Sequence, residues 1–272
     1  IGMIDMVCVN LYAFEATVAR EGVTEAEAIE NIDIGGPSML RSAAKNFASV
    51  AVVTEPSSYD DILSEMRANE GATTLATRRQ LAEDVFKKTS SYDMAIWHYL
   101  ANEGDIDRLD NTIDVRLTKK QDLRYGENPH QIAGFYVNQN NFEHTLAHAE
   151  QIQGKDLSYN NILDTDSAWS ACREFTEGPC CVIVKHTNPC GISVAGDIVT
   201  AYKRAHECDP ISAYGGVMAF NRTVTTELVR AILDNKQFVE VMVAPDYEPE
   251  AIEMITAKPN IRVLKTGGVN AP

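Results

Sequence analysis

The sequence lacks the features that define several large classes of protein. No apolar run approaches the roughly 20 residues of a membrane-spanning helix, and neither a Walker loop nor a G-x-G-x-x-G motif is present. Basic residues are the minority, because 24 Lys and Arg stand against 39 Asp and Glu and the net charge is −15. An acidic chain is poorly suited to bind nucleic acid or an anionic membrane. We therefore expect no nucleic acid and no membrane among its partners.

The cysteines show no pairing pattern. The six cysteines form no C-x-x-C pair and lie mostly in apolar or helical contexts. Such usage is typical of buried free thiols in a reducing compartment, and no signal peptide is visible, so the sequence predicts a cytoplasmic protein. The chain opens on an apolar run at residues 4–9 rather than on Met, which we interpret as a cut within a longer protein.

Apolar strand patterns alternate with helix patterns along the chain, whose 272 residues suit about two domains. The strands are expected at 4–9, 48–54, 115–123, 134–137, 180–185, 216–220, 239–243 and 261–264. The helices are expected at 24–31, 37–47, 59–69, 74–100, 164–175, 198–206, 225–234 and 250–256. A polar, acidic stretch at 101–116 separates the two halves. The pattern predicts an α/β fold, with a parallel layer in the first half.

The segment 182–191 is the most suggestive of chemistry. Lys185 and His186 end an uninterrupted apolar run, and Asn188, Pro189 and Gly191 then predict a bend. In open α/β sheets the crevice beyond the carboxyl ends of the strands binds ligands, and an imidazole titrates near pH 6.5, which suits proton transfer. The alternative is a solvated lysine at a strand end followed by a histidine in a turn.

Three further segments carry polar groups that suit a nucleotide. Arg124 offers guanidinium donors for a phosphate and Tyr125 an aromatic face for a base, although a charged turn would use the same residues. Asn160 and Asn161 suit either a base edge or a helix cap. Residues 209–216 predict a glycine-rich turn that enters a strand.

One pattern resembles a zinc-binding signature but lacks one of its ligands. His148 and Glu150, followed by Pro189 and Cys190, resemble the H-x-E…P-C-x-x-C signature of zinc deaminases. The last position of that signature is Ser193 here, and serine is a poor zinc ligand beside thiolates and imidazoles. We therefore predict no metal site.

Several strings together resemble one family, the bifunctional purine biosynthesis proteins (PurH family) that join AICAR formyltransferase to IMP cyclohydrolase. The strings occur in the family's order at 10–12, 32–36, 41–46, 124–131, 185–191 and 211–216. The resemblance implies formyl transfer from 10-formyltetrahydrofolate to AICAR, giving FAICAR, and closure of FAICAR to IMP. It also implies a methylglyoxal-synthase-like parallel α/β domain followed by a cytidine-deaminase-like α/β domain without zinc.

The resemblance also assigns roles to residues of the second half. His186 is implied as the base for the AICAR amine, and Lys185 as the cation and proton donor. Arg124 would hold the phosphate, Tyr125 would pack on the nucleotide, and Asn161 would contact the base. Two more substrate-binding positions are implied, Asn188 and Gly191.

In the first half, the resemblance implies Tyr12, Asp33 and Lys45 as cyclohydrolase residues. Ala13 and Phe47 depart from the family's usual proline and histidine. The implied division is 1–104 for the carboxyl-terminal part of the cyclohydrolase domain, 105–116 for a linker and 117–272 for the amino-terminal part of the formyltransferase domain. By the same resemblance the chain is truncated at both ends and forms a homodimer. The competing interpretation is a non-catalytic α/β nucleotide-binding module.

Overall fold

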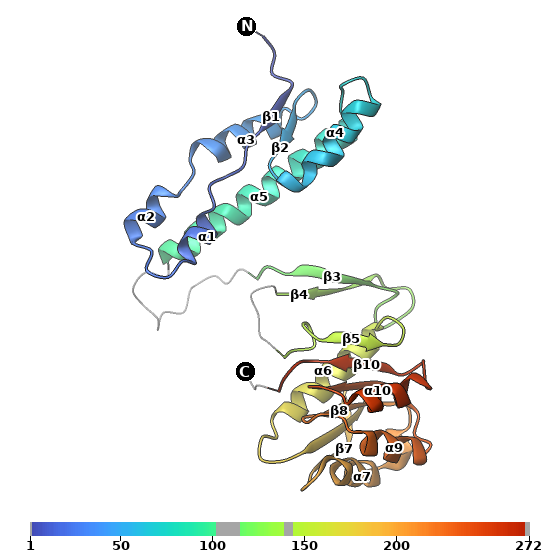
Figure 1. Ribbon diagram of the computed structural model, residues 1–272. Coiled ribbons are helices and arrows are strands. Elements are labelled where there is room, and N and C mark those ends of the chain that lie inside the picture. The colour runs from blue at the N-terminus through green and yellow to red at the C-terminus, as the bar shows by residue number, and fades with distance from the viewer. Residues whose placement is uncertain (1, 102–114, 139–143, 270–272) are drawn as a thin grey trace. The chain divides into compact units, whose positions relative to one another are not determined.

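The computed structural model describes residues 2–101, 115–138 and 144–269, and the chain divides into two compact units, Ile1–Thr112 and Ile113–Pro272 (Figure 1). The division lies within the acidic stretch of the sequence, most of which, 102–114, falls outside the described residues. Both units mix helices with strands, so the predicted α/β class is confirmed. None of the described helices combines the length and the apolar character that crossing a membrane requires.

The first unit is built around two parallel strands, β1 (Met6–Cys8) and β2 (Ala51–Val53). Its other elements are α1 (Phe14–Val18), α2 (Glu25–Glu30), α3 (Gly35–Lys45), η1 (Pro56–Ser58), α4 (Tyr59–Ala68) and α5 (Leu75–Ala101). Leu40 of α3, Val52 of β2 and Val85 of α5 are fully buried in one cluster. Burying each such side chain is worth about 1.5–3 kcal/mol, which holds the helices on the strands.

The second unit contains a six-stranded mixed sheet in the order β5-β10-β9-β8-β6-β7. Its strands are β5 (Glu150–Gln153), β6 (Cys180–Lys185), β7 (Asn188–Val194), β8 (Gly216–Phe220), β9 (Val239–Ala244) and β10 (Arg262–Lys265). Its helices are α6 (Tyr159–Arg173), α7 (Ile198–Cys208), α8 (Pro210–Ala213), α9 (Thr226–Asp234) and α10 (Pro249–Thr256). A separate antiparallel pair is formed by β3 (Thr118–Leu123) and β4 (Ala133–Val137).

Helices cover both faces of this sheet, which explains why β6 reads as a continuous apolar run. Successive side chains of a strand point to opposite faces. Ile183 accordingly packs with residues of α7, α9 and α10, whereas Val182 and Val184 pack with residues of α6. The strand predicted at 180–185 is confirmed.

Two strands of the structure were not predicted from the sequence. One of them lies where a bend was expected after Lys185. Residues 188–194 form β7, antiparallel to β6, so the chain reverses at His186 and Thr187 instead. The polar strand β5 was likewise not expected. Because β6 is also antiparallel to β8, its carboxyl end lies at the edge where β8, β9 and β10 begin. The expectation based on carboxyl ends of parallel strands is therefore wrong for Lys185.

Candidate active site

The β6–β7 hairpin carries Lys185 and His186 at its turn. Lys185 pairs with Asn188, so His186 and Thr187 are the two turn residues, and their φ angles are 54° and 60°. Two consecutive left-handed residues are the mark of a type I′ turn, for which Asn and Gly are the usual choices. A β-branched residue such as Thr187 adopts this conformation only with support from its surroundings.

That support comes from helix α6. The Asp164 carboxylate accepts the Thr187 backbone N–H at 2.8 Å and the His186 backbone N–H at 3.3 Å. The carbonyl oxygen of His186 accepts hydrogen bonds from Thr187 Oγ1 at 2.7 Å and Asn188 Nδ2 at 2.9 Å. The peptide groups of His186 are thus held on both sides. Its side chain is exposed, and within the described residues the imidazole makes no hydrogen bond.

Lys185 is fixed differently. Its Nζ donates to the backbone oxygen of Tyr214 at 2.8 Å, just after the short helix α8. Helix α8, which replaces part of the glycine-rich turn expected at 209–216, begins with Asp209 as its cap, and Asp209 Oδ1 accepts from Ser212 N at 3.0 Å. A carbonyl is a neutral partner, and Lys185 forms no ion pair within the described part of the chain. No carboxylate among the described residues therefore competes with a negative charge that develops near its Nζ.

Asn161 lies one helical turn before Asp164, so α6 links it to the hairpin. Its Oδ1 accepts from Ser158 N at 3.2 Å and from Ser158 Oγ at 3.0 Å, and its backbone N–H donates to Ser158 Oγ at 3.2 Å. The helix-cap interpretation of this asparagine is confirmed. Contact with a nucleotide base stays a prediction, and it would involve the amide nitrogen.

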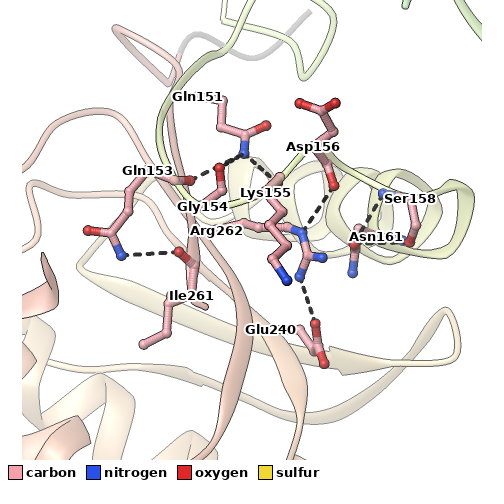
Figure 2. A network of polar contacts seen from close by, with 10 residues as sticks. All are labelled: Gln151, Gln153, Gly154, Lys155, Asp156, Ser158, Asn161, Glu240, Ile261 and Arg262. Carbon is pink, nitrogen blue, oxygen red and sulfur yellow. Dashed lines mark hydrogen bonds and ion pairs between the residues drawn. The ribbon is translucent and has the colours of Figure 1, made fainter. Parts of the chain in front are cut away.

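A polar network holds the loop that leads into α6 (Figure 2). Gln151 Nε2 donates to the backbone oxygens of Gln153, Gly154 and Lys155, the last at 2.7 Å. Arg262 of β10 donates to the backbone oxygen of Asp156 at 3.4 Å and forms an ion pair with Glu240 at 2.9 Å. The start of α6 is therefore fastened to the sheet by side chains that the sequence analysis did not single out.

The loop with Arg124 and Tyr125 follows β3. The Arg124 guanidinium carbon lies 5.1 Å from the centroid of the Tyr125 ring. Gln131 closes the loop, because its backbone oxygen accepts from Gly126 N at 3.1 Å and its Oε1 accepts from Asn128 N at 2.8 Å. The structure brings Arg124 and Tyr125 together. It shows no contact in the described residues between them and Lys185 or His186.

Gly191 has a packing role. It is buried in β7 against α7, and a Cβ built on it overlaps the carbonyl oxygen of Ala205 and lies 2.8 Å from the Ala205 carbonyl carbon. Only glycine permits this approach of helix to strand. Substrate binding by Gly191 stays a prediction, as does binding by Asn188, whose amide supports the hairpin turn.

In the first unit, Asp33 and Tyr12 are neighbours. Asp33 Oδ1 accepts from Gly36 N at 2.7 Å at the start of α3, and Asp33 Oδ2 accepts from the backbone N–H of Tyr12 at 3.4 Å. Tyr92 anchors the same segment, because its hydroxyl accepts from Asp33 N at 2.8 Å and donates to the carbonyl oxygen of Asn31 at 3.1 Å.

Lys45 stands apart from this pair. It lies in the last turn of α3, whose 11 residues span about 16 Å. There it lines an open groove of 760 Å³ with Arg41, Arg79, Phe47 and Phe86 among its neighbours. The structure thus brings the Asp33 carboxylate to the backbone of Tyr12 and places Lys45 at the other end of α3.

The thiol nearest the hairpin turn is not activated for chemistry. Burial, and then the Asp209 carboxylate, raise the pKa of the Cys190 thiol, so it stays protonated at neutral pH and is a poor nucleophile. In residues 2–101, 115–138 and 144–269, no group of three or more His, Cys, Asp or Glu side chains is arranged to hold a metal ion.

Comparison with known proteins adds the family. A family model described as AICARFT/IMPCHase bienzyme matches residues 43–271. The chain belongs to the AICARFT/IMPCHase bienzyme family. A solved structure described as "Crystal structure of ForH" is 34% identical, with a TM-score of 0.34, and the match covers 38% of this chain and 53% of that one. The chain therefore spans about half the length of that protein.

The AICARFT/IMPCHase match divides the predicted site residues. It includes the hairpin, α6, the Arg124 loop and Lys45, whereas Tyr12 and Asp33 precede it. Sequence reasoning missed Asp164 and Tyr214, which contact the hairpin from distant segments. The only signal for Asp164 was its place at the start of the helix expected at 164–175, three residues after Asn161.

Proposed function

We propose that the chain contributes to both reactions of an AICARFT/IMPCHase bienzyme, with formyl transfer in the second unit and cyclisation in the first. The observation that carries the formyltransferase assignment is the β6–β7 hairpin. It presents an exposed imidazole next to an ammonium group that lacks an ion-pair partner among the described residues, and α6 ties it to Asn161. The family match supplies the reaction class.

The proposed chemistry follows from the groups present. The AICAR amine attacks the formyl carbon of 10-formyltetrahydrofolate, and a tetrahedral intermediate with a negatively charged oxygen forms. His186 takes the proton of the amine, and Lys185 stabilises the oxyanion. The bond between the formyl carbon and the folate nitrogen then breaks, and Lys185 donates a proton to that nitrogen. The proton that His186 took from the amine then replaces the one that Lys185 gave up. The products are FAICAR and tetrahydrofolate.

Substrate would be held by groups on three segments. Arg124 and Tyr125 suit the phosphate and the flat base, because a guanidinium and an aromatic ring offer the matching geometry. The amide nitrogen of Asn161 suits a carbonyl of the base. Asn188 and Gly191 complete the set as parts of the hairpin that shape the site.

The cyclisation proposal rests on the first unit. The carboxamide nitrogen of FAICAR attacks the formyl carbon, and water leaves as the ring closes to IMP. The Asp33 carboxylate contacts the backbone N–H of Tyr12, and Lys45 would have to approach both residues from the far end of α3. The Tyr12 hydroxyl and the Asp33 carboxylate are the groups that could transfer protons. The remaining proposals rest on the family alone. We propose a linker at 105–116 between a methylglyoxal-synthase-like first domain and a zinc-free cytidine-deaminase-like second domain. We also propose a cytoplasmic location and a homodimer.

A pair of histidine variants tests the formyltransferase assignment. In the full-length protein, His186→Ala should lower kcat for formyl transfer by about 10²-fold to 10⁴-fold, the usual cost of losing a general base. Cyclisation of FAICAR, assayed separately, should persist. His148→Ala is the matched control, because His148 is exposed in the same unit and bonds only locally to Thr145. AICAR binding without turnover in the unaltered protein would instead favour a non-catalytic nucleotide-binding module.

A further inference from the structure

We propose that Asp164 is a positioning residue for the Lys185–His186 pair, acting through the backbone of the hairpin turn. The proposal rests on the formyltransferase function proposed above for the role of His186, and on the hydrogen bonds of the turn for the role of Asp164. No residue of α6 other than Asn161 was expected at the site, so this assigns a second task to the helix.

The backbone conformation of the turn is energetically unfavourable unless a neighbouring group stabilises it. His186 and Thr187 both have left-handed φ angles, and Thr187 is β-branched. Residues in sparsely populated backbone regions are strained, so the surroundings must hold the conformation in place. Neither residue is the Asn or Gly that forms type I′ turns readily.

The Asp164 carboxylate is placed so that it can stabilise the turn. The two N–H groups of the turn point the same way, and one carboxylate oxygen accepts each of them, at 2.8 Å and 3.3 Å. Hydrogen bonds to an ionised acceptor are roughly twice as strong as neutral ones. A carboxylate is needed here, because an asparagine would present one oxygen and one donating NH₂ group to two donors.

The helix that carries Asp164 is itself rigidly placed. Its first turn is closed by the Ser158–Asn161 box, and the loop before it is fastened by Gln151 and Arg262 (Figure 2). Its opposite face is anchored by Trp169, which is 1% exposed. Helix α6 therefore fixes the position of the hairpin turn, and it keeps Asn161 and His186 in a constant position relative to each other.

Asp164 differs from a catalytic residue in what its loss should do. If it only fixes the turn, its removal displaces the imidazole without changing which groups carry protons. A displacement of about 1 Å costs about 10²-fold in rate. We expect Asp164→Ala to lower kcat for formyl transfer by that factor, with a change in KM for AICAR of less than about 3-fold and an unchanged pH profile.

A second-site variant separates positioning from chemistry. Glycine adopts left-handed φ without strain, so Thr187→Gly should recover about 10-fold of the lost kcat in the Asp164→Ala background. The single variant Thr187→Gly is the reference, because it also removes the Thr187 Oγ1 bond to the His186 carbonyl oxygen. Asp164→Asn should fall between the parent and Asp164→Ala. The control is Ser170→Ala, on the same helix and exposed. Lost activity that Thr187→Gly does not restore, or a shifted acid limb of the pH profile, would overturn the positioning role.

Hydrogen exchange tests the proposal independently of any activity. The amide of Thr187 should exchange at least about 10-fold faster in Asp164→Ala, because its acceptor is gone and the turn opens locally. Unchanged exchange there would overturn the proposal even if activity falls. If the unaltered protein transfers no formyl group, the proposed function fails, and the exchange measurement still decides whether Asp164 holds the turn.

Discussion

Gly191→Ala gives a direct test of how closely α7 approaches β7. The new Cβ would lie 2.8 Å from the carbonyl carbon of Ala205 and 3.1 Å from Cys208 Cβ, whereas ordinary contact begins at 3.4 Å. The obstacle is helix backbone, which cannot rotate away, so α7 has to move outward by at least about 0.6 Å along its contact with β7. Overpacking of this kind costs about 1–3 kcal/mol, and we expect the upper end here.

The loss is large because α7 buries much of what it carries. Ala201, Tyr202 and Ala205 are each at most 1% exposed, so an outward shift loosens several contacts at once. A cost of about 3 kcal/mol with a urea slope of about 2 kcal/mol/M moves the unfolding midpoint by about 1.5 M. The slope itself should not change, because the exposed surface of the unfolded chain is the same.

The two tryptophans make the assay specific to one unit. Trp97 lies in the first unit and Trp169 in the second, where its Nε1 donates to the His144 backbone oxygen at 2.7 Å. In a Trp97→Phe background, fluorescence therefore reports unfolding of the second unit alone. Gly196→Ala is the control, because nothing lies within 4 Å of its Cβ. A midpoint for Gly191→Ala within about 0.2 M of the parent would refute the packing argument and return Gly191 to substrate binding alone.

Two further predictions concern stability. The Asp246 carboxylate accepts from Lys265 Nζ at 2.6 Å and from Tyr247 N at 2.8 Å, and these bonds lower the pKa of Asp246. The ionised carboxylate therefore stabilises the folded protein at any pH above the usual aspartate pKa of about 3.9. This contribution is lost as the pH falls through the lowered pKa of the folded state. Asp246→Asn should thus be less stable than the parent at pH 7 and match it near pH 2, and a gap that widens on acidification in urea titrations would contradict this. Tyr92→Phe removes two hydrogen bonds beside Asp33 and should lower the free energy of unfolding of the first unit by about 1–2 kcal/mol. Trp97 fluorescence in a Trp169→Phe background measures this unfolding, and Tyr12→Phe is the control. An unchanged midpoint would show that the Asp33 segment needs no anchor.

The sequence predicted the buried elements well, because burial leaves a local pattern. The strand 216–220 and the capped helix after Thr24 appear where apolar runs and a capping box indicate them. Strands β5 and β7 were missed for a physical reason. Both lie at edges of the sheet, where polar residues and proline are tolerated and the apolar pattern disappears.

The candidate site was predictable only in part. Lys185 and His186 stand out because they end a buried strand, but the reversal at His186 has no glycine or asparagine to announce it. Its partner Asp164 lies 22 residues away from His186 in the chain, and only the packing of α6 on the sheet brings them together. The separation of Lys45 from Asp33 follows from the length of α3, which no motif encodes.

The outer strand β7 has a consequence for how copies of this chain can meet. Pro189 has no N–H to offer a further strand, and a bulge at Cys190 interrupts the register with β6. An edge shaped in this way is a poor template for strand addition, so the sheet resists growth into aggregates from the side that bears the hairpin turn. A second copy of the chain that approaches this side must do so through side chains rather than by extending the sheet.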